Sequence, residues 1–394
     1  GIIGVGGQGG YNWSQLADQE IVVLCDVDLA RVGAARERFP NAEVVQDFRR
    51  VLDRADVDAV VISTPDHWHA IPTVWAMEAG KHVYCEKPLT HSIYECRVVR
   101  QTAKKCRRVT QMGTQIHAGN NYRRVVELIR AGAIGAVRRV DVWCEKQPVP
   151  GRRMRVGDPP PTLDYDLWLG PAPEFPYNAQ VIVFHWRWWW EFGGGVLADM
   201  ACHFMDLPHW ALDLRYPERI SATGTEFTDA DNKVPVEMRV DFDYPARGEQ
   251  PPVHLVWWHG IPGPRGEDGQ VLALGRRNGV LFHGEKGQLL ADYDTHRLLP
   301  EERFRDYVRP EPTIPPSVGH HREWIEAIRT GGETTCNFDY SGALTEAVLL
   351  GNVAYRLGRE IRWDPERLEI PNVRREEWEP LIRREYRGAW KLVP

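Results

Sequence analysis

The sequence predicts an α/β chain in which a doubly wound parallel sheet is followed by an α+β domain with a large, open, mostly antiparallel sheet. Up to about residue 115, short apolar runs alternate with helix-like stretches, a pattern typical of βαβ units. After about residue 135, apolar residues recur at every second position, as in strands with one buried face. The length of 394 residues suits two or three domains.

In the N-terminal part, each strand candidate is a short apolar run, and the stretches between them carry apolar residues at helical spacing. We expect strands at 1–5, 21–25, 59–63, 82–85 and 108–112, and helices at 13–17, 29–38, 48–53, 71–79 and 93–105. We assign residues 1–118 to this domain, 119–362 to a substrate and oligomerisation domain, and 363–394 to a tail that wraps the surface.

In the second domain, the clearest alternation is Val236, Met238, Val240, Phe242 and Tyr244. Similar alternation at 140–144 and 253–257 predicts two further strands, and 320–329 and 341–357 have the pattern of helices. Two long inserts, 146–192 and 260–278, are rich in Pro, Gly, Trp and Arg. We expect both to form loops over a site.

Composition excludes several classes of protein. The net charge of -6 argues against a nucleic-acid binder, and no apolar run reaches the roughly 18 residues that a membrane span needs. Seven cysteines without a CxxC pair indicate a reducing compartment, so we expect a cytoplasmic protein. The first residues already have the pattern of a strand, so we expect the natural N-terminus to be missing, which leaves an exported form open.

A glycine-rich segment at 4–9, Gly-Val-Gly-Gly-Gln-Gly, lies between a predicted strand and a predicted helix. Asp26 follows at the end of the next strand, at the spacing of a dinucleotide-binding fingerprint. The glycines let the backbone approach a pyrophosphate at the helix N-terminus, and Asp26 can accept hydrogen bonds from ribose hydroxyls. This pattern favours NAD over NADP. Because Arg31 lies nearby in the sequence, NADP remains an alternative, less expected cofactor. The cofactor-binding residues predicted here are Gly4, Gly6, Gln8, Gly9 and Asp26.

The next strand ends in Ser-Thr-Pro-Asp-His-Trp-His at 63–69. Because ligands of doubly wound sheets lie at the carboxyl ends of the strands, this turn should border the dinucleotide. An alternative is that it only starts and caps the following helix, and direct catalysis by His67 or His69 is a further alternative. The cofactor-binding residues predicted from this strand and the next are Thr64, Pro65, His69 and Glu86.

Lys87 follows the carboxyl end of the next strand, where its ammonium can bind a hydroxyl that is to be oxidised. Three glycines at 193–195 open a helix on which Asp199 and His203 lie four residues apart, and therefore on one face. A carboxylate beside an imidazole suits a general base. The pair could also be purely structural, or could hold a metal, for which the sequence offers no obvious third ligand. We therefore predict no metal.

Together these motifs resemble the Gfo/Idh/MocA oxidoreductases, and the resemblance spans nearly the whole chain, including Trp168-Leu169-Gly170-Pro171. The resemblance implies a catalytic set of Lys87, Asp199 and His203. His203 would take the proton of a ring hydroxyl, Lys87 would hold the oxygen, and Asp199 would orient the set while a hydride passes to the nicotinamide. It also implies a homodimer or homotetramer formed through the second sheet.

Residues expected to contact the substrate come from two places: the stretch after the last strand of the first domain, and the Trp-rich stretch before the triple glycine. Aromatic side chains beside an arginine suit a pyranose with a polar or acidic substituent. The residues predicted to bind substrate are Gln115, His117, Tyr122, Trp186, Arg187 and Trp188.

Three functions remain open from the sequence. The favoured one is an NAD(H)-dependent dehydrogenase that oxidises a secondary hydroxyl of a sugar, glycoside or polyol, such as C3 of a pyranose. The second is a glycoside hydrolase that uses NAD in a redox-neutral cycle. The third is a non-catalytic NAD-binding sensor, which would not need Lys87 and His203.

Overall fold

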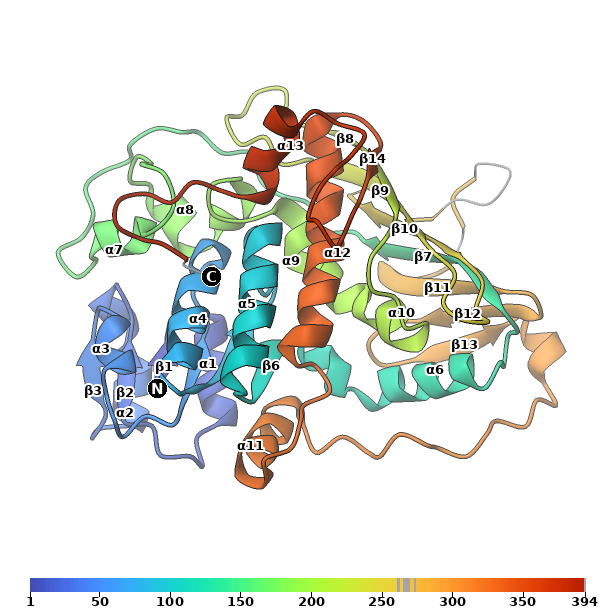
Figure 1. Cartoon of the computed structure of the whole chain (residues 1–394), viewed down its shortest axis with the longest axis horizontal. Helices are drawn as coiled ribbons and strands as arrows, with labels where there is room; N and C mark the ends of the chain where they lie inside the picture. Colours follow the sequence, from blue (N-terminus) through green and yellow to red (C-terminus); the bar gives the residue numbers. More distant parts are fainter. Residues whose placement is uncertain (261–262, 265–269, 273, 393–394) are drawn as a thin grey trace.

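The structure is a computed structural model that describes residues 1–260, 263–264, 270–272 and 274–392. Its two sheets lie side by side, with the first sheet at the N-terminal end of the chain and the second at the right of Figure 1. The predicted loop at 260–278 lies partly outside the described residues.

The first sheet has six parallel strands in the order β3-β2-β1-β4-β5-β6. Its strands are β1 (Ile2–Ile3), β2 (Val23–Cys25), β3 (Glu43–Val45), β4 (Ala59–Ile62), β5 (His82–Glu86) and β6 (Thr110–Gly113). Its helices are α1 (Gln8–Gln15), α2 (Gly33–Arg38), α3 (Arg49–Leu52), α4 (Ala70–Glu78) and α5 (Ile93–Cys106). This strand order is that of the dinucleotide-binding Rossmann fold, so the predicted doubly wound sheet is confirmed.

Two features of this sheet differ from the sequence prediction. Strand β3 was not predicted, because it has only three residues at the sheet edge and two of them are not buried. Helix α1 begins at Gln8 rather than at residue 13, directly after the glycine turn. The first turn of α1 is Gln-Gly-Gly-Tyr, which carries no apolar periodicity that a pattern search would find.

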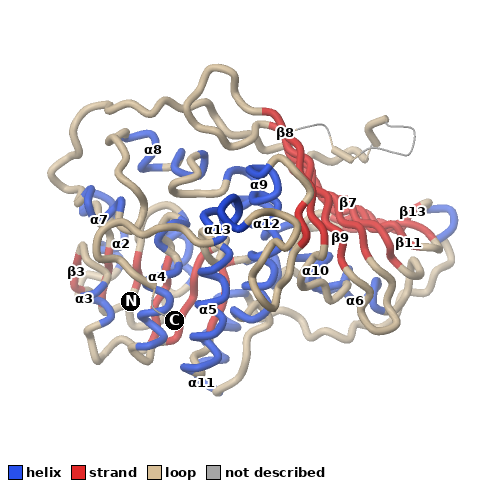
Figure 2. Tube along the Cα trace, turned by 45° about the horizontal axis from the view of Figure 1, so that its top comes forward, coloured by secondary structure: helices blue, strands red, loops and turns tan. Residues whose placement is uncertain are grey.

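The second sheet has eight strands in the order β13-β12-β11-β7-β10-β9-β8-β14. Its strands are β7 (Val137–Cys144), β8 (Arg219–Thr225), β9 (Glu237–Tyr244), β10 (Val253–His259), β11 (Asn278–Gly284), β12 (Gly287–Ala291), β13 (His296–Leu299) and β14 (Ile361–Arg362). Only the pair β7 and β10 is parallel, and all other neighbours are antiparallel. The prediction of an open, mostly antiparallel sheet is therefore confirmed. Figure 2 shows its twist.

The alternation read from the sequence assigns side chains to the two faces of this sheet. Val142 and Trp257 pack into the main core with the helices, whereas Trp143 and Trp258 pack together on the opposite face. The remaining helices are α6 (Asn120–Arg130), α7 (Tyr165–Leu169), α8 (Ala179–Val183), α9 (Gly195–Phe204), α10 (Asp206–Ala211), α11 (His320–Thr330), α12 (Phe338–Leu357) and α13 (Arg375–Ile382). Short α7 and α8 lie inside the segment 146–192 that we predicted as a loop.

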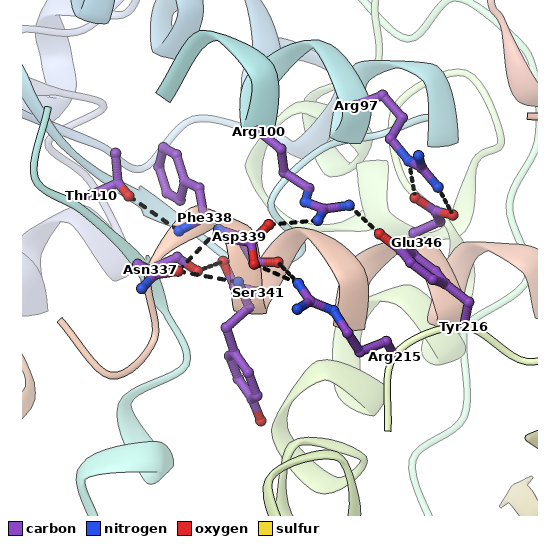
Figure 3. A network of polar contacts seen from close by, with 11 residues as sticks. Arg97, Arg100, Thr110, Arg215, Tyr216, Asn337, Phe338, Asp339, Ser341 and Glu346 are labelled. Carbon is purple, nitrogen blue, oxygen red and sulfur yellow. Dashed lines mark hydrogen bonds and ion pairs between the residues drawn. The ribbon is translucent and has the colours of Figure 1, made fainter. Parts of the chain in front are cut away.

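Helix α12 joins the two halves, because it packs against α5 on one side and against α9 and β8 on the other. Figure 3 shows the polar part of the contact with α5. There Arg97 donates two hydrogen bonds, of 2.7 and 2.8 Å, to the fully buried carboxylate of Glu346. Nearby, Arg100 and Arg215 both bind Asp339 at the start of α12. These contacts fix the second domain against the first.

Segments from the C-terminal part also pack on the first domain. Trp324 of α11 lies in the core cluster that contains Ile2 and Tyr84 of the first sheet. In the tail, Trp390 packs on Trp68 and Trp75, which places the end of the described chain beside α4 (Figure 1). Among the described residues, no helix has the length and hydropathy needed to cross a bilayer.

Candidate active site

A cavity opens at the carboxyl ends of the first sheet, beside the neighbouring strands β1 and β4, where the strand order reverses. The glycine loop, the ends of β4 and β5 and the segment 167–187 form its walls. The predicted site residues that line this cavity are Gly4, Gly6, Gln8, Asp26, Thr64, Pro65, His69, Glu86, Lys87, Trp186, Arg187 and Asp199.

The glycine loop is shaped by two close backbone approaches. A Cβ atom on Gly9 would lie 1.9 Å from the carbonyl oxygen of Gly4. Gly4 itself has a φ of +83°, and a Cβ there would lie 2.8 Å from the carbonyl of Ser63, which directly follows β4. Only glycine fits at both positions. The amide groups of the loop and of the first turn of α1 thus remain at the cavity wall, where they fit a pyrophosphate.

Asp26, at the end of β2, is held in place by the backbone. Its two carboxylate oxygens accept hydrogen bonds of 3.0 Å from the amides of Val5 and Asp28. Burial raises its pKa, while these amides and Arg31 act in the opposite direction. The Arg31 guanidinium lies over Gly6, where a Cβ would meet its Nε at 2.4 Å. A carboxylate and a guanidinium therefore lie together beside the glycine loop, and both line the cavity.

The turn after β4 contains the two histidines that the sequence left open as catalysts. His67 is fully buried, and its Nε2 lies 3.0 Å from the carbonyl of Trp168. The nitrogens of His69 lie 2.7 Å from the carbonyl of Pro88 and 2.9 Å from that of Thr64. Both rings therefore hold the backbone around the cavity. Thr64 lines the cavity, and its buried Oγ1 has no hydrogen-bond partner in the described chain, which fits a bound cofactor.

Glu86 and Gln115 belong to a buried hydrogen-bond network at the end of β5, which we call the bracket and which also includes Asn12 and Tyr84. The Oε1 of Glu86 accepts hydrogen bonds of 2.9 Å from Asn12 and from Gln115, and Gln115 also donates to Tyr84. Burial raises the pKa of Glu86. Gln115 does not line the cavity of the glycine loop. The bracket joins α1, β5 and the turn after β6, and so it fixes the direction in which Lys87 leaves β5.

Lys87 and Asp199 meet across the two domains. The Nζ of Lys87 donates to the backbone carbonyl of Asp199 at 2.5 Å and to its Oδ1 at 2.9 Å. Burial lowers the pKa of Lys87, but Asp199 outweighs it, so the pKa is raised and the ammonium stays charged. An ammonium has three N–H groups, and the recorded contacts use two of them. The third is available to a ligand in the cavity.

Asp199 has two further cationic partners. Lys146 donates to its Oδ2 at 2.6 Å, and the Nε of Arg187 lies 3.3 Å from its Oδ1. Burial raises the pKa of Asp199, but Lys87, Lys146 and Arg187 outweigh it and hold the pKa far below its ordinary value. The sequence did not single out Lys146. The available signal was its place just beyond β7, at a strand end beside a predicted loop.

The triple glycine brings this cluster together. A Cβ on Gly193 would lie 2.8 Å from the Cα of Arg187, so the glycine lets the two backbones touch. Gly195, with a φ of +66°, turns the chain into α9, which carries Asp199 on its second turn. Arg187 then lies over the rings of Trp186 and Phe184, with its guanidinium carbon 4.2 and 4.6 Å from their centres.

His203 is next to this cluster without bonding to Asp199: no hydrogen bond between the two is recorded in the described residues. Its buried Nδ1 has no partner there either. Burial has the largest effect on the pKa of His203, and the positive charge of Lys87 acts in the same direction. Together they lower the pKa to about 3, so the imidazole is neutral at pH 7. The hydroxyl of Tyr122 donates to the carbonyl of His203, and the side chain of Tyr122 is fully buried. Tyr122 supports the helix rather than lining the cavity.

Two other predicted substrate residues lie outside the cavity. His117 is fully buried, its Nδ1 lies 2.9 Å from both carboxylate oxygens of Asp206, and its ring stacks on Trp210. Trp188 is buried and packs against Val196. Of the six residues predicted to bind substrate, Trp186 and Arg187 line the cavity of the glycine loop. The other four, Gln115, His117, Tyr122 and Trp188, do not.

Asp66 lines the cavity, and the sequence did not select it. It follows Pro65 at the end of β4 and is 5% exposed. Burial raises its pKa to about 8, against the opposite effects of Arg187 and Lys87. No group of three His, Cys, Asp or Glu side chains within the described ranges could hold a metal ion.

Comparisons with known proteins agree with this geometry. Residues 1–114 match the family model described as "Oxidoreductase family, NAD-binding Rossmann fold", and residues 142–392 match "Oxidoreductase family, C-terminal alpha/beta domain". Scyllo-inositol dehydrogenase from Lactobacillus casei, solved with bound NAD(H) and scyllo-inositol, has a TM-score of 0.60 at 18% identity and covers 92% of this chain and 97% of that one. This likeness concerns the fold.

Two groups of curated relatives match a shorter stretch. A glycosyl hydrolase family 109 protein from Shewanella sp. (strain W3-18-1) is 32% identical over 147 residues, which is 34% of this chain and 32% of the relative. An inositol 2-dehydrogenase from Salmonella paratyphi B is 31% identical over 141 residues, 34% of this chain and 42% of the relative. The matches thus span less than half of either relative. Since the two family models together cover nearly the whole chain, the protein belongs to the Gfo/Idh/MocA family of NAD-binding oxidoreductases.

Proposed function

We propose that this protein is an NAD-dependent dehydrogenase that oxidises a secondary hydroxyl of a sugar, glycoside or polyol to a carbonyl. One observation carries the proposal. The Lys87 ammonium, fixed by Asp199, faces the same cavity as the glycine loop. A hydroxyl bound there would lie beside the cofactor. The glycine loop, Asp26 and the unpartnered hydroxyl of Thr64 would hold the dinucleotide, which supplies a hydride acceptor when it is bound.

Lys87 acts as a donor in this scheme. Because its ammonium stays charged, its third N–H can hydrogen-bond the hydroxyl oxygen and stabilise the negative charge that grows as the proton leaves. His203, neutral at pH 7, accepts the proton. A dinucleotide held at the glycine loop would accept the hydride from the carbon, so that the hydroxyl becomes a carbonyl and its proton passes to His203. Asp199 positions Lys87 rather than His203.

NADH fluorescence with a panel of sugars, glycosides, inositols and sugar acids tests the proposal. Lys87→Met should abolish turnover while NAD binding, measured by calorimetry, is retained. His203→Ala should reduce kcat by about 100-fold or more. The exposed Lys104→Met is the matched control and should leave turnover unchanged. Full turnover by Lys87→Met would contradict the role of this residue. A wild type that binds NAD but turns over no member of the panel would fit a sensor.

NAD is the proposed cofactor rather than NADP. The carboxylate of Asp26 would repel a 2′-phosphate, whereas Arg31 beside it would attract one. Asp26→Ser should therefore raise the KM for NAD and lower that for NADP. An unchanged ratio of kcat/KM for the two cofactors would contradict this role of Asp26.

A second candidate is redox-neutral glycoside hydrolysis, which the identity to the glycosyl hydrolase family 109 protein favours. Lys87 and His203 would serve the same oxidation, followed by elimination of the glycosidic group, addition of water and return of the hydride. Release of nitrophenol from nitrophenyl glycosides without net NADH formation would identify this reaction.

Two further proposals concern the protein as a whole. The resemblance to the Gfo/Idh/MocA family supports a homodimer or homotetramer formed through the second sheet. Analytical ultracentrifugation tests this oligomeric state.

A cytoplasmic location is supported by seven free cysteines, and cell fractionation tests this location.

A further inference from the structure

The cluster of cations around Asp199, of which Lys87 and Arg187 line the cavity, contains more positive charge than a neutral sugar needs. Lys87, Lys146 and Arg187 converge on the single carboxylate of Asp199, whose side chain is 7% exposed. Lys146 and Arg187 both come from the second domain and remain 32% and 22% exposed. Clustered cations repel one another at these distances, so the arrangement favours a further anion.

The neighbouring acids do not supply that anion. The carboxylate of Glu86 is engaged by Asn12 and Gln115. Asp66 is the other acid near the cluster, and burial raises its pKa to about 8, so it is mostly protonated at pH 7. Three cations therefore face Asp199 and the more distant charge of Glu86, and a positive charge is left over.

Lys146 and Arg187 also have hydrogen-bond donors to spare. Lys146 uses one N–H on Asp199 and makes a 3.7 Å contact with the sulfur of Met200. Arg187 uses Nε on Asp199 and Nη1 on the carbonyl of Phe184. For its Nη2, the described chain provides no recorded partner. The recorded contacts thus leave donors of both side chains for a ligand.

The guanidinium of Arg187 lies over two aromatic rings. Its carbon is 4.2 Å from the ring centre of Trp186 and 4.6 Å from that of Phe184, and the Lys146 ammonium lies 5.7 Å from the centre of the same Phe184 ring. Stacking on aromatic faces leaves the edge of a guanidinium available, and its fork of N–H groups matches the two oxygens of a carboxylate. A planar carboxylate suits this edge better than a single hydroxyl does.

We propose that the substrate carries a carboxylate, as in a uronic or aldonic acid, which Arg187 and Lys146 bind while Lys87 binds the hydroxyl to be oxidised. The inference rests on the proposed dehydrogenase function and names its substrate class. The acid group fixes the sugar at one end, so the reacting hydroxyl is presented to Lys87 in one orientation.

Matched pairs of neutral and acidic substrates test the proposal: methyl glucoside against methyl glucuronide, galactose against galacturonate, and sorbitol against gluconate, each with NAD. The acidic member of the productive pair should have a kcat/KM about 10- to 100-fold higher, the effect of one or two charge-assisted hydrogen bonds. Arg187→Met and Lys146→Met should each reduce this preference by about 10-fold or more, mainly through KM. Arg155→Met removes an exposed arginine and should leave the preference intact.

Failure of this inference can be told apart from failure of the proposed function. Equal or better turnover of the neutral members, or a preference that survives Arg187→Met, would overturn the carboxylate site while the dehydrogenase remains. If no pair is turned over, the proposed activity fails for these substrates, and calorimetry decides the carboxylate site alone. Glucuronate or gluconate that binds the NAD-loaded wild type and not Arg187→Met would support the site, and absence of binding to the wild type would overturn it.

Discussion

Asp199→Asn tests the charge cluster directly, because it removes one negative charge and nearly preserves the shape of the side chain. The carboxylate is 7% exposed and pairs with Lys87, Lys146 and Arg187. Removing one member of a buried ion pair costs about 3–5 kcal/mol because its partners are left unpaired. Since Lys146 and Arg187 are partly exposed and screened by solvent, we expect the lower end, about 3 kcal/mol of the free energy of unfolding.

The pH dependence of this loss has a defined sign. The pKa of Asp199 is depressed in the folded state, so its contribution to stability is present above the unfolded pKa of about 4 and is lost as the pH falls toward the folded value. The pKa of Lys87 is raised, so its contribution is present below about pH 10 and is lost above it. The difference in unfolding free energy between wild type and variant should be constant from about pH 5 to 9 and should shrink below about pH 4.

Urea unfolding followed by tryptophan fluorescence between pH 3.5 and 9 measures this difference. Asp229→Asn is the matched control, because Asp229 is 88% exposed and pairs with Arg152 at the surface, so no measurable change is expected. If Asp199→Asn proved as stable as the wild type over this range, or if the difference grew toward acid pH, the buried charge cluster would not be what stabilises this part of the protein.

Three further outcomes are expected. Gly9→Ala would place a Cβ 1.9 Å from a carbonyl oxygen of the glycine loop and should weaken NAD binding, measured by calorimetry, by about 100-fold or more. Gly33→Ala is the control, because the space around its Cβ is open, and it should not weaken NAD binding. Equal affinities of the two variants would argue against the tight loop. Arg97→Met should destabilise the protein by about 3–5 kcal/mol, because the buried Glu346 loses two hydrogen bonds. Adding Glu346→Met should restore most of the lost stability in thermal unfolding. A double variant no more stable than the single variant would contradict the pairing. Burial raises the pKa of Asp66 to about 8, so this group binds its proton more tightly in the folded state and wild-type stability should fall from about pH 4 to 8. Asp66→Asn should gain stability relative to the wild type over that interval. Parallel pH profiles of stability for the two proteins would rule the effect out.

The sequence by itself predicted the class of each sheet and the glycine loop at the cavity, although it predicted only β7, β9 and β10 of the second sheet. Strand and helix periodicities reveal which face of an element is buried, and the glycines at 4–9 encode a close backbone approach that no other residue allows. The strand end before Lys87 predicted its place at the edge of the first sheet, whereas only the family resemblance implied that Asp199 lies at the same cavity. These are local rules, so they can be read from neighbouring residues.

Only the tertiary structure decided which side chains meet. Asp199 contacts Lys146, which is 53 residues away along the chain, rather than His203, which shares its helix face. His117 follows a strand end as Lys87 does, yet it is buried against Asp206. Periodicity reports burial but not the partner, because the partner depends on how two domains pack and on where buried charges find compensation. The extra positive charge beside Asp199, and with it the acidic substrate class we propose, therefore emerged only when segments distant in sequence were brought together.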